Sequence, residues 1–129
     1  MQYEYTEFPG RPLDEYNDCV VRAMSLAADV PYELAHRILA KTGRKKGKPT
    51  SDRRMDKAAE MLGLEKQFPK KQGTKISNFV ERTDQDKIIA VAVWGHLVAM
   101  KGDIELDLWQ YTKPGKTVRF YYVKKSWFQ

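Results

Sequence analysis

The sequence predicts an α+β domain in which N-terminal helices, among them a central helix bearing Cys19, pack on a C-terminal antiparallel β-sheet. Helical spacing of apolar residues dominates the first half of the chain, and β-branched runs separated by glycine turns dominate the second half. Helices followed by antiparallel strands are typical of the α+β class. A chain of 129 residues, 42% of them hydrophobic, can bury one core but not two, so we expect a single domain over residues 1–129.

The central helix is expected to begin at Asn17, because asparagine is a favourable N-cap residue. Its polar positions, Arg22, Ser25 and Asp29, recur at helical spacing and predict one narrow solvent-exposed stripe on an otherwise buried helix. Cys19 then falls in the first turn, where free N–H groups and the helix dipole favour a thiolate and lower the pKa of the thiol. The alternative is an inert cysteine that packs as a small apolar residue.

Start and stop signals predict three more helices. The second runs from Pro31 to Gly43, the third starts at Thr50 or Ser51 and ends at Gly63, and a short fourth starts at Thr74. Residues 1–13 contain scattered aromatics and a Pro-Gly-Arg-Pro segment, which predict an irregular or short extended arm. His36 falls on the polar side of the second helix, so an ordinary surface histidine is the preferred interpretation.

A continuous β-rich run from Ile88 to Trp94 predicts a strand that is buried on both faces at the centre of the sheet. Residues 95–100 and 103–108 flank a glycine turn and predict a β-hairpin, and residues 117–124 alternate as a further strand. The acidic residues near these turns are expected to be turn and surface charges: Asp84, Asp86, Asp103 and Glu105.

The hairpin predicts a contact between a histidine and a carboxylate. If residues 101 and 102 form the turn, His96 lies directly opposite Asp107, close enough for the carboxylate to accept a hydrogen bond from the ring. If residues 102 and 103 form the turn, Asp107 lies diagonally from His96 on the same face. In either register the two side chains share a face.

Cys19, His96 and Asp107 therefore form a candidate catalytic group. A cysteine at the start of a helix can act as a nucleophile, a histidine can take and return its proton, and a carboxylate can orient the imidazole ring. The N–H groups at the start of the helix can stabilise an oxyanion.

At these residues the chain resembles the papain-like cysteine peptidase superfamily, in which a core helix bearing the nucleophile packs on an antiparallel sheet bearing His and Asp or Asn. More narrowly, it is similar to a group of small bacteriophage proteins described as cysteine peptidases. The similar segments are residues 17–23 (NDCVVRA), Pro31-Tyr32, residues 43–45 (GRK), Gly95-His96 and, as the last matching position, Asp107. The resemblance covers residues 17–51 and 88–108.

The resemblance implies that Cys19 is the nucleophile, His96 the general base and acid, and Asp107 the orienting carboxylate of a thiol-dependent hydrolase. The scissile bond, whether peptide, isopeptide, side-chain amide or thioester, stays open, and the substrate is expected to be a peptide or protein in the host cytoplasm. Papain-like enzymes often carry a Gln about six residues before the cysteine, and here that position is Leu13. Asn17 and the N–H of Cys19 are then the local candidates for an oxyanion donor.

The net charge of +6 is unevenly distributed, because residues 41–75 hold 12 of the 23 basic residues and only 4 of the 17 acidic ones. The candidate anion-binding residues in this segment are Arg44, Lys45, Lys46, Lys48, Arg53 and Arg54. The alternative function is therefore a basic binding module, with an inactive papain-like core, for nucleic acid or an acidic host protein. A solvated loop is the commoner reason for such a run, and the aromatics of a single-strand binding surface do not interleave with it.

Other classes of site are disfavoured by the sequence. One cysteine and two widely separated histidines lack zinc-ligand spacing, and no glycine-rich phosphate loop follows a strand, so we expect no metal and no cofactor. A single cysteine forms no intrachain disulfide, the first ten residues do not resemble a signal peptide, and no apolar run is long enough to cross a membrane. We expect a cytoplasmic protein without a membrane partner.

Overall fold

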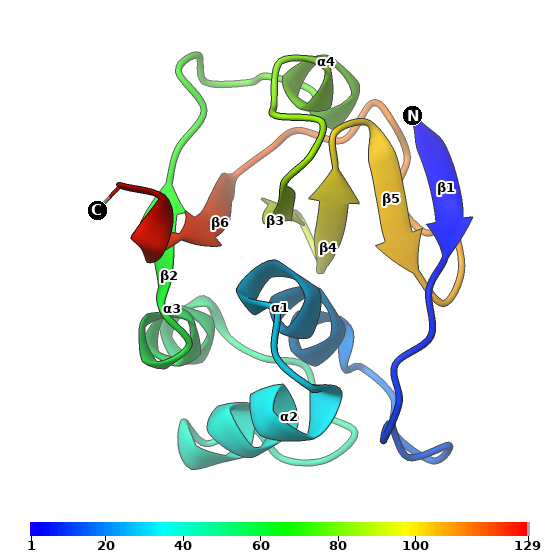
Figure 1. Cartoon of the computed structure of the whole chain (residues 1–129), viewed down its shortest axis with the longest axis vertical. Helices are drawn as coiled ribbons and strands as arrows, with labels where there is room; N and C mark the ends of the chain where they lie inside the picture. The colour runs from blue at the N-terminus through cyan, green and yellow to red at the C-terminus, as the bar shows by residue number, and fades with distance from the viewer. Residues whose placement is uncertain (129) are drawn as a thin grey trace.

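The computed structural model describes residues 1–128, and Figure 1 shows a six-stranded sheet with helices on both sides. The strands are β1 (Gln2–Tyr5), β2 (Leu64–Gln67), β3 (Ile88–Val93), β4 (His96–Lys101), β5 (Ile104–Asp107) and β6 (Phe120–Lys124). The helices are α1 (Cys19–Ala28), α2 (Tyr32–Lys41), α3 (Asp52–Met61) and α4 (Ile76–Glu81), followed by a terminal 3-10 turn, η1 (Lys125–Phe128). The predicted α+β class is confirmed.

The sheet is mixed, not antiparallel as expected from the sequence. Its strand order is β1-β5-β4-β3-β6-β2, and β1 pairs with β5 in parallel while every other pairing is antiparallel. The N-terminal arm supplies β1 and therefore precedes the helices, whereas β2 follows α3 and closes the opposite edge. Both edge strands are four residues long and rich in polar residues, which is why the sequence pattern does not reveal β2 and predicts β1 only as one form of an irregular or short extended arm.

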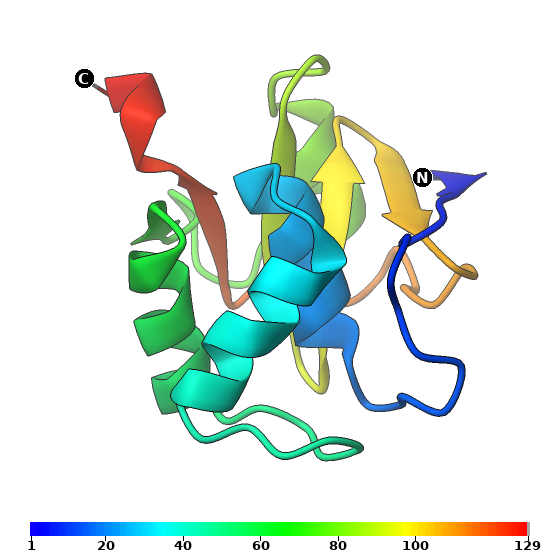
Figure 2. The same ribbon diagram turned by 60° about the horizontal axis from the view of Figure 1, so that its bottom comes forward.

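The two faces of the sheet carry separate apolar cores. Leu97, Ala99 and Leu106 pack with α1, α2 and α3, which Figure 2 shows in front of the sheet. Val98 and Met100, which alternate with them along β4, pack on the other face with Val80 of α4. α1 lies at the centre of the first core, because Val21 and Met24 are fully buried.

The predicted solvent-exposed stripe of α1 is wrong. Arg22 and Ser25 are both buried, at 3% and 4% exposure, and only Asp29, just after the helix, is exposed. The hydroxyl of Ser25 donates to the carbonyl of Arg22, and the guanidinium of Arg22 binds two buried carboxylates. Polar residues at helical spacing need not face water when other parts of the chain supply partners.

The hairpin of β4 and β5 adopts the second of the two predicted registers. Ala99 pairs with Leu106 and Lys101 with Ile104, so Gly102 and Asp103 form the turn. Gly102 has a φ of +57°, a backbone conformation that glycine adopts without strain. This register places Asp107 diagonally from His96.

Two further sequence predictions are confirmed. The side chain of Ser51 caps α3 by accepting a hydrogen bond from the backbone N–H of Arg54, at 3.4 Å. The short fourth helix forms with Ile76 and Val80 buried. Within residues 1–128, no helix combines the length and the apolar character that crossing a bilayer would need.

Candidate active site

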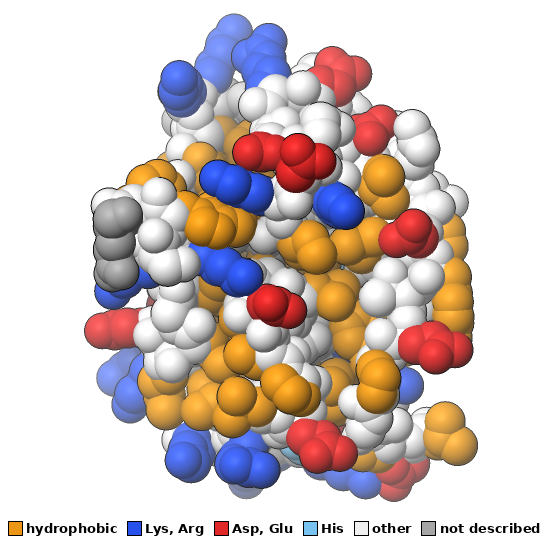
Figure 3. Space-filling model, viewed as in Figure 1, with side chains coloured by type: hydrophobic (Ala, Val, Ile, Leu, Met, Phe, Trp, Pro, Cys, Tyr) orange, Lys and Arg blue, Asp and Glu red, His pale blue; other side chains and the backbone are white. Residues whose placement is uncertain are grey.

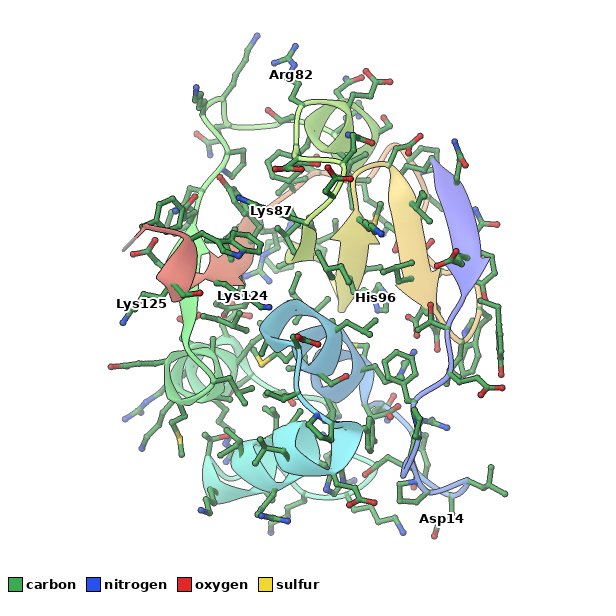
Figure 4. All side chains as sticks on the ribbon, viewed as in Figure 1. Asp14, Arg82, Lys87, His96, Lys124 and Lys125 are labelled. Atoms are coloured by element: carbon green, nitrogen blue, oxygen red, sulfur yellow. The ribbon has the colours of Figure 1, made fainter. Side chains whose placement is uncertain are left out.

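Cys19 and His96 come together where α1 and β4 begin. Two cavities at this end of the sheet are each lined by both residues, together with Val93 and Gly95. The backbone N–H of Leu97 is close enough to the sulfur of Cys19 to lower the pKa of the thiol. Figure 4 labels His96 at the end of β4 that lies next to α1. The fold thus brings the expected nucleophile and the expected base to the same two cavities, which are together called the Cys19 hollow below.

The thiol of Cys19 does not have the low pKa expected at a helix N-terminus. Burial raises the pKa of this thiol, and the effect outweighs the Leu97 N–H and the positive charge of Arg22, which both lower it. The carboxylates of Asp107 and Asp18 raise it further. The prediction is wrong because the sequence places Cys19 in the first turn but does not show how deeply that turn is buried.

His96 is a neutral imidazole near pH 7. Burial and then the positive charge of Arg22 lower its pKa to about 4. Its ring packs against the ring of Tyr111, with centroids 4.8 Å apart. Its Nε2 atom is buried and has no hydrogen-bond partner within residues 1–128. A neutral imidazole with an unpaired nitrogen can accept a proton.

Asp107 does not form the predicted hydrogen bond with His96. Its Oδ1 accepts from the guanidinium of Arg22 and, at 2.8 Å, from the backbone N–H of Leu108. One carboxylate oxygen of Asp107 still lies within 4.8 Å of a ring nitrogen of His96. The diagonal register keeps the two groups near each other, but Arg22 is the direct partner of the carboxylate.

Arg22 is the site residue that the sequence interpretation missed. Its side chain is 4% exposed, contacts Asp107, and donates from Nε to Asp18 at 3.2 Å. Its guanidinium carbon lies 5.4 Å from the ring centre of Trp109 and 5.5 Å from that of Tyr111. The i, i+4 spacing of Asp18 and Arg22 was the available signal, because it places the two side chains on one face of the helix.

Glu105 is fully buried, contrary to the surface position expected for it. Its carboxylate accepts hydrogen bonds from the hydroxyl of Thr112 at 2.9 Å and from the backbone N–H groups of Tyr111 and Thr112. Ligand atoms of Glu105, His96 and Asp107 lie within 4.8 Å of one another, the spacing of a possible metal site. However, donors of the chain already hold both carboxylates, and the guanidinium beside Asp107 would repel a cation.

Asn17 is not the N-cap of α1. Asp18 occupies that position without capping the helix, because its carboxylate accepts from Arg11 and from Tyr32, each at 2.8 Å. Asn17 has a φ of +54°, and its side-chain amide donates to the carbonyl of Gly47 at 2.9 Å. It still lines one of the two cavities, but its amide is directed at the loop rather than held for an oxyanion.

A second buried charge cluster ties the basic loop to the segment before α1. The carboxylate of Glu15, fully buried, binds Arg44 at 3.1 Å, His36 at 2.7 Å and the backbone N–H of Gly47 at 2.8 Å. Burial by itself would raise the pKa of Glu15, but the hydrogen bonds from Arg44, His36 and the backbone lower it to about 2. His36 is therefore a structural partner of Glu15 and not the ordinary surface residue expected.

Of the six basic residues in the predicted anion-binding segment, one is buried and one is paired at the surface. Arg44 is 5% exposed and pairs with Glu15, and the ammonium of Lys46 lies 2.7 Å from a carboxylate oxygen of Asp14. Lys46 is nevertheless exposed, and the other four are exposed without a carboxylate within 4.0 Å in residues 1–128: Lys45, Lys48, Arg53 and Arg54. The sequence predicts charge along the segment but not which charges the chain itself neutralises.

Comparisons with protein-family models, with curated proteins and with solved structures found no match to this chain.

Proposed function

We propose that this protein is a thiol-dependent hydrolase in which Cys19 is the nucleophile and His96 is the proton acceptor. The observation that supports the proposal is that the two side chains line the same two cavities, with Nε2 of His96 buried and unpaired. Perturbed ionisable groups in a hollow are typical of active sites. The resemblance to papain-like cysteine peptidases favours the same assignment.

The chemistry follows from the charge state of the two groups. The thiol of Cys19 and the imidazole of His96 are both neutral near pH 7, because burial raises the pKa of one and lowers the pKa of the other. The thiol proton therefore passes to the imidazole as sulfur attacks the substrate carbonyl, rather than beforehand. The imidazolium returns this proton to the leaving amine, and water then hydrolyses the thioester with the same imidazole as base.

In this proposal Arg22 and Asp107 are positioning residues. The positive charge of Arg22 favours the thiolate that forms during attack, since it lowers the pKa of the Cys19 thiol. Asp107 holds Arg22 in place through their ion pair and balances its charge in the buried site. The N–H of Leu97 also lowers the pKa of the Cys19 thiol and so favours the same negative charge.

The test is acylation of the protein by activated esters and by peptide thioesters, followed by mass spectrometry of the intact chain. We expect one acyl group on Cys19, the only cysteine, and its release with time. His96→Gln should slow acylation by about a hundredfold or more, because it removes the base. His36→Gln is the matched control, since the other histidine lies in the Glu15 cluster, and it should acylate at the wild-type rate.

Equal acylation rates in wild type and His96→Gln would contradict the proposal, because Cys19 would then react as an ordinary thiol. Cys19→Ala should abolish acylation while lowering the melting temperature by only a few degrees, since alanine suits a helix and removes a single sulfur atom from a partly buried position. A loss of activity that followed a loss of stability would assign Cys19 a structural role instead.

A further inference from the structure

A further hollow of the molecule lies away from Cys19, on the sheet face that α4 covers. It has a volume of about 460 Å³. Its walls come from the loop after β2, from α4, from the face of β3 and β6 that packs against α4, and from the terminal turn η1. A cavity of this size is in the range that accommodates small ligands. Figure 3 shows basic side chains next to apolar ones on this side of the molecule, and Figure 4 labels Arg82 and Lys87 there.

The floor of this hollow, here called the α4 groove, is aromatic. Phe79, Tyr121 and Trp127 line it and come from α4, β6 and η1 respectively. The rings of Phe79 and Tyr121 are 4.8 Å apart between centroids, and all three side chains are only partly buried. The groove therefore presents flat ring surfaces to whatever enters it.

The rim of the α4 groove is basic. Lys70, Lys71, Arg82 and Lys87 line it, against one acidic residue, Asp84. Lys87 is the only one of the four with a carboxylate within 4.0 Å in the part of the chain described, and that contact, with Asp84, is loose at 3.9 Å. The ammonium of Lys87 also lies 4.7 Å from the ring centre of Trp127, so positive charge directly adjoins the aromatic floor.

We propose that the α4 groove binds single-stranded nucleic acid, with a base stacked on the aromatic floor and the flanking phosphates held by the basic rim. Aromatic rings that stack bases, combined with a positive groove that follows the backbone, are the recurring features of such sites. A duplex would use the rim alone, because its base faces are already stacked. An acidic peptide would satisfy the charges but would leave the ring surfaces without a planar partner.

The proposal is independent of the catalytic assignment, because the groove and the Cys19 hollow share no lining residue. It also differs from the anion-binding segment expected at residues 43–54, whose own sequence contains no aromatic residue. The sequence did not reveal the groove, since its rings come from residues 79, 121 and 127 and two of its lysines from the loop after β2.

The first experiment uses Trp127 as its own reporter. Trp94 and Trp109 are the other two tryptophans, so Trp94→Phe combined with Trp109→Phe leaves Trp127 as the single indole fluorophore. Titration with an oligothymidylate of about 12 nucleotides should quench Trp127 fluorescence in a saturable manner, as stacking on a base does. Binding detected by anisotropy of a labelled oligonucleotide without quenching of Trp127 would overturn the stacking geometry and with it the proposal.

The second experiment separates the rim from the basic loop. Lys70→Gln with Lys71→Gln should weaken binding about tenfold and reduce the salt slope by about 1.4, since each phosphate contact on a single strand contributes about 0.7. Trp127→Ala should weaken it about fivefold or more, whereas Trp127→Phe keeps a stacking face and most of the affinity. Lys45→Gln with Lys48→Gln is the matched control and should leave affinity unchanged.

Melting temperatures of all variants, measured alongside, exclude unfolding as the cause of lost binding. Preference for the single strand over a duplex of the same length, and over polyglutamate at equal charge, supports the proposal. Equal affinity for the duplex, retention of polyglutamate with similar strength, or loss of binding only in the Lys45 and Lys48 variant would each overturn it.

Discussion

The Cys19 hollow and the α4 groove differ in whether their charged side chains are buried or exposed. Around the hollow, Arg22, Asp107 and Asp18 are buried and paired with one another. Around the groove, the charged side chains are exposed on the rim and the buried residues are apolar. Buried charges cost desolvation free energy, so their concentration at one end of the sheet is typical of a functional site. Exposed charges cost little and are suited to attracting a charged ligand.

The largest expected effect is from removing a buried partner of Arg22. Asp107→Ala should lower the free energy of unfolding by about 3 to 4 kcal/mol, because the buried guanidinium of Arg22 then loses one of the two carboxylates that it binds and keeps Asp18. Urea denaturation measures this loss. Asp84→Ala, at the rim of the α4 groove, is the comparison and should change it by less than about 0.5 kcal/mol. Equal effects of the two substitutions would remove the distinction between the regions.

The next effect concerns Glu15, whose cluster supports the segment before α1. Glu15→Gln should lower the free energy of unfolding by about 2 to 3 kcal/mol at pH 7, because Arg44 stays buried with a weaker partner. The pKa of Glu15 is lowered to about 2 in the folded protein. Its stabilising contribution is therefore complete above the unfolded-state pKa of about 4.3 and is lost as pH falls towards 2.

Denaturation of wild type and Glu15→Gln in parallel between pH 7 and pH 2.5 isolates this group from the other carboxyl groups. The difference between the two proteins should shrink as pH falls. A constant difference across that range would show that Glu15 contributes by packing alone.

A smaller effect is expected in the reactivity of the thiol. Because burial raises the pKa of Cys19, iodoacetamide should alkylate the folded protein more slowly at pH 8 than it alkylates the same cysteine in urea, where the thiol pKa is about 8.5. Because Cys19 is the only cysteine, all alkylation in both the folded and the unfolded protein occurs at this residue. Alkylation of the folded protein that already reached its maximum below pH 7 would contradict the neutral resting state proposed for the site.

The smallest effect is expected at the rim of the α4 groove. Arg82→Gln should change the free energy of unfolding by less than about 0.5 kcal/mol, since this exposed guanidinium has no carboxylate within 4.0 Å in residues 1–128. Thermal denaturation at low and at moderate salt measures it. A decrease of more than about 1 kcal/mol in the free energy of unfolding would mean that Arg82 stabilises the fold, which would contradict its proposed role in ligand binding.

The sequence by itself determined the elements with strong local signals. The apolar spacing of α1, the cap of α3 at Ser51 and the β-branched run of β3 are local properties, so they could be predicted. The sequence also placed Cys19 and His96 at the starts of a helix and a strand. A short extended arm was one of the two alternatives predicted for residues 1–13, but its pairing with β5 was not predicted, and β2 was missed entirely, because at a sheet edge the partner strand, not the local pattern, selects extended backbone.

Only the tertiary structure decided the environment of each ionisable group. Arg22 could equally have faced water, and its contact with Asp107 depends on residues 85 positions apart in the chain. The direction of the Cys19 pKa shift depends on how β4 and the loops bury the first turn of α1, since desolvation outweighs the local effect of the helix terminus. The α4 groove likewise joins rings and lysines from separate elements, because packing, and not sequence order, determines which side chains become neighbours.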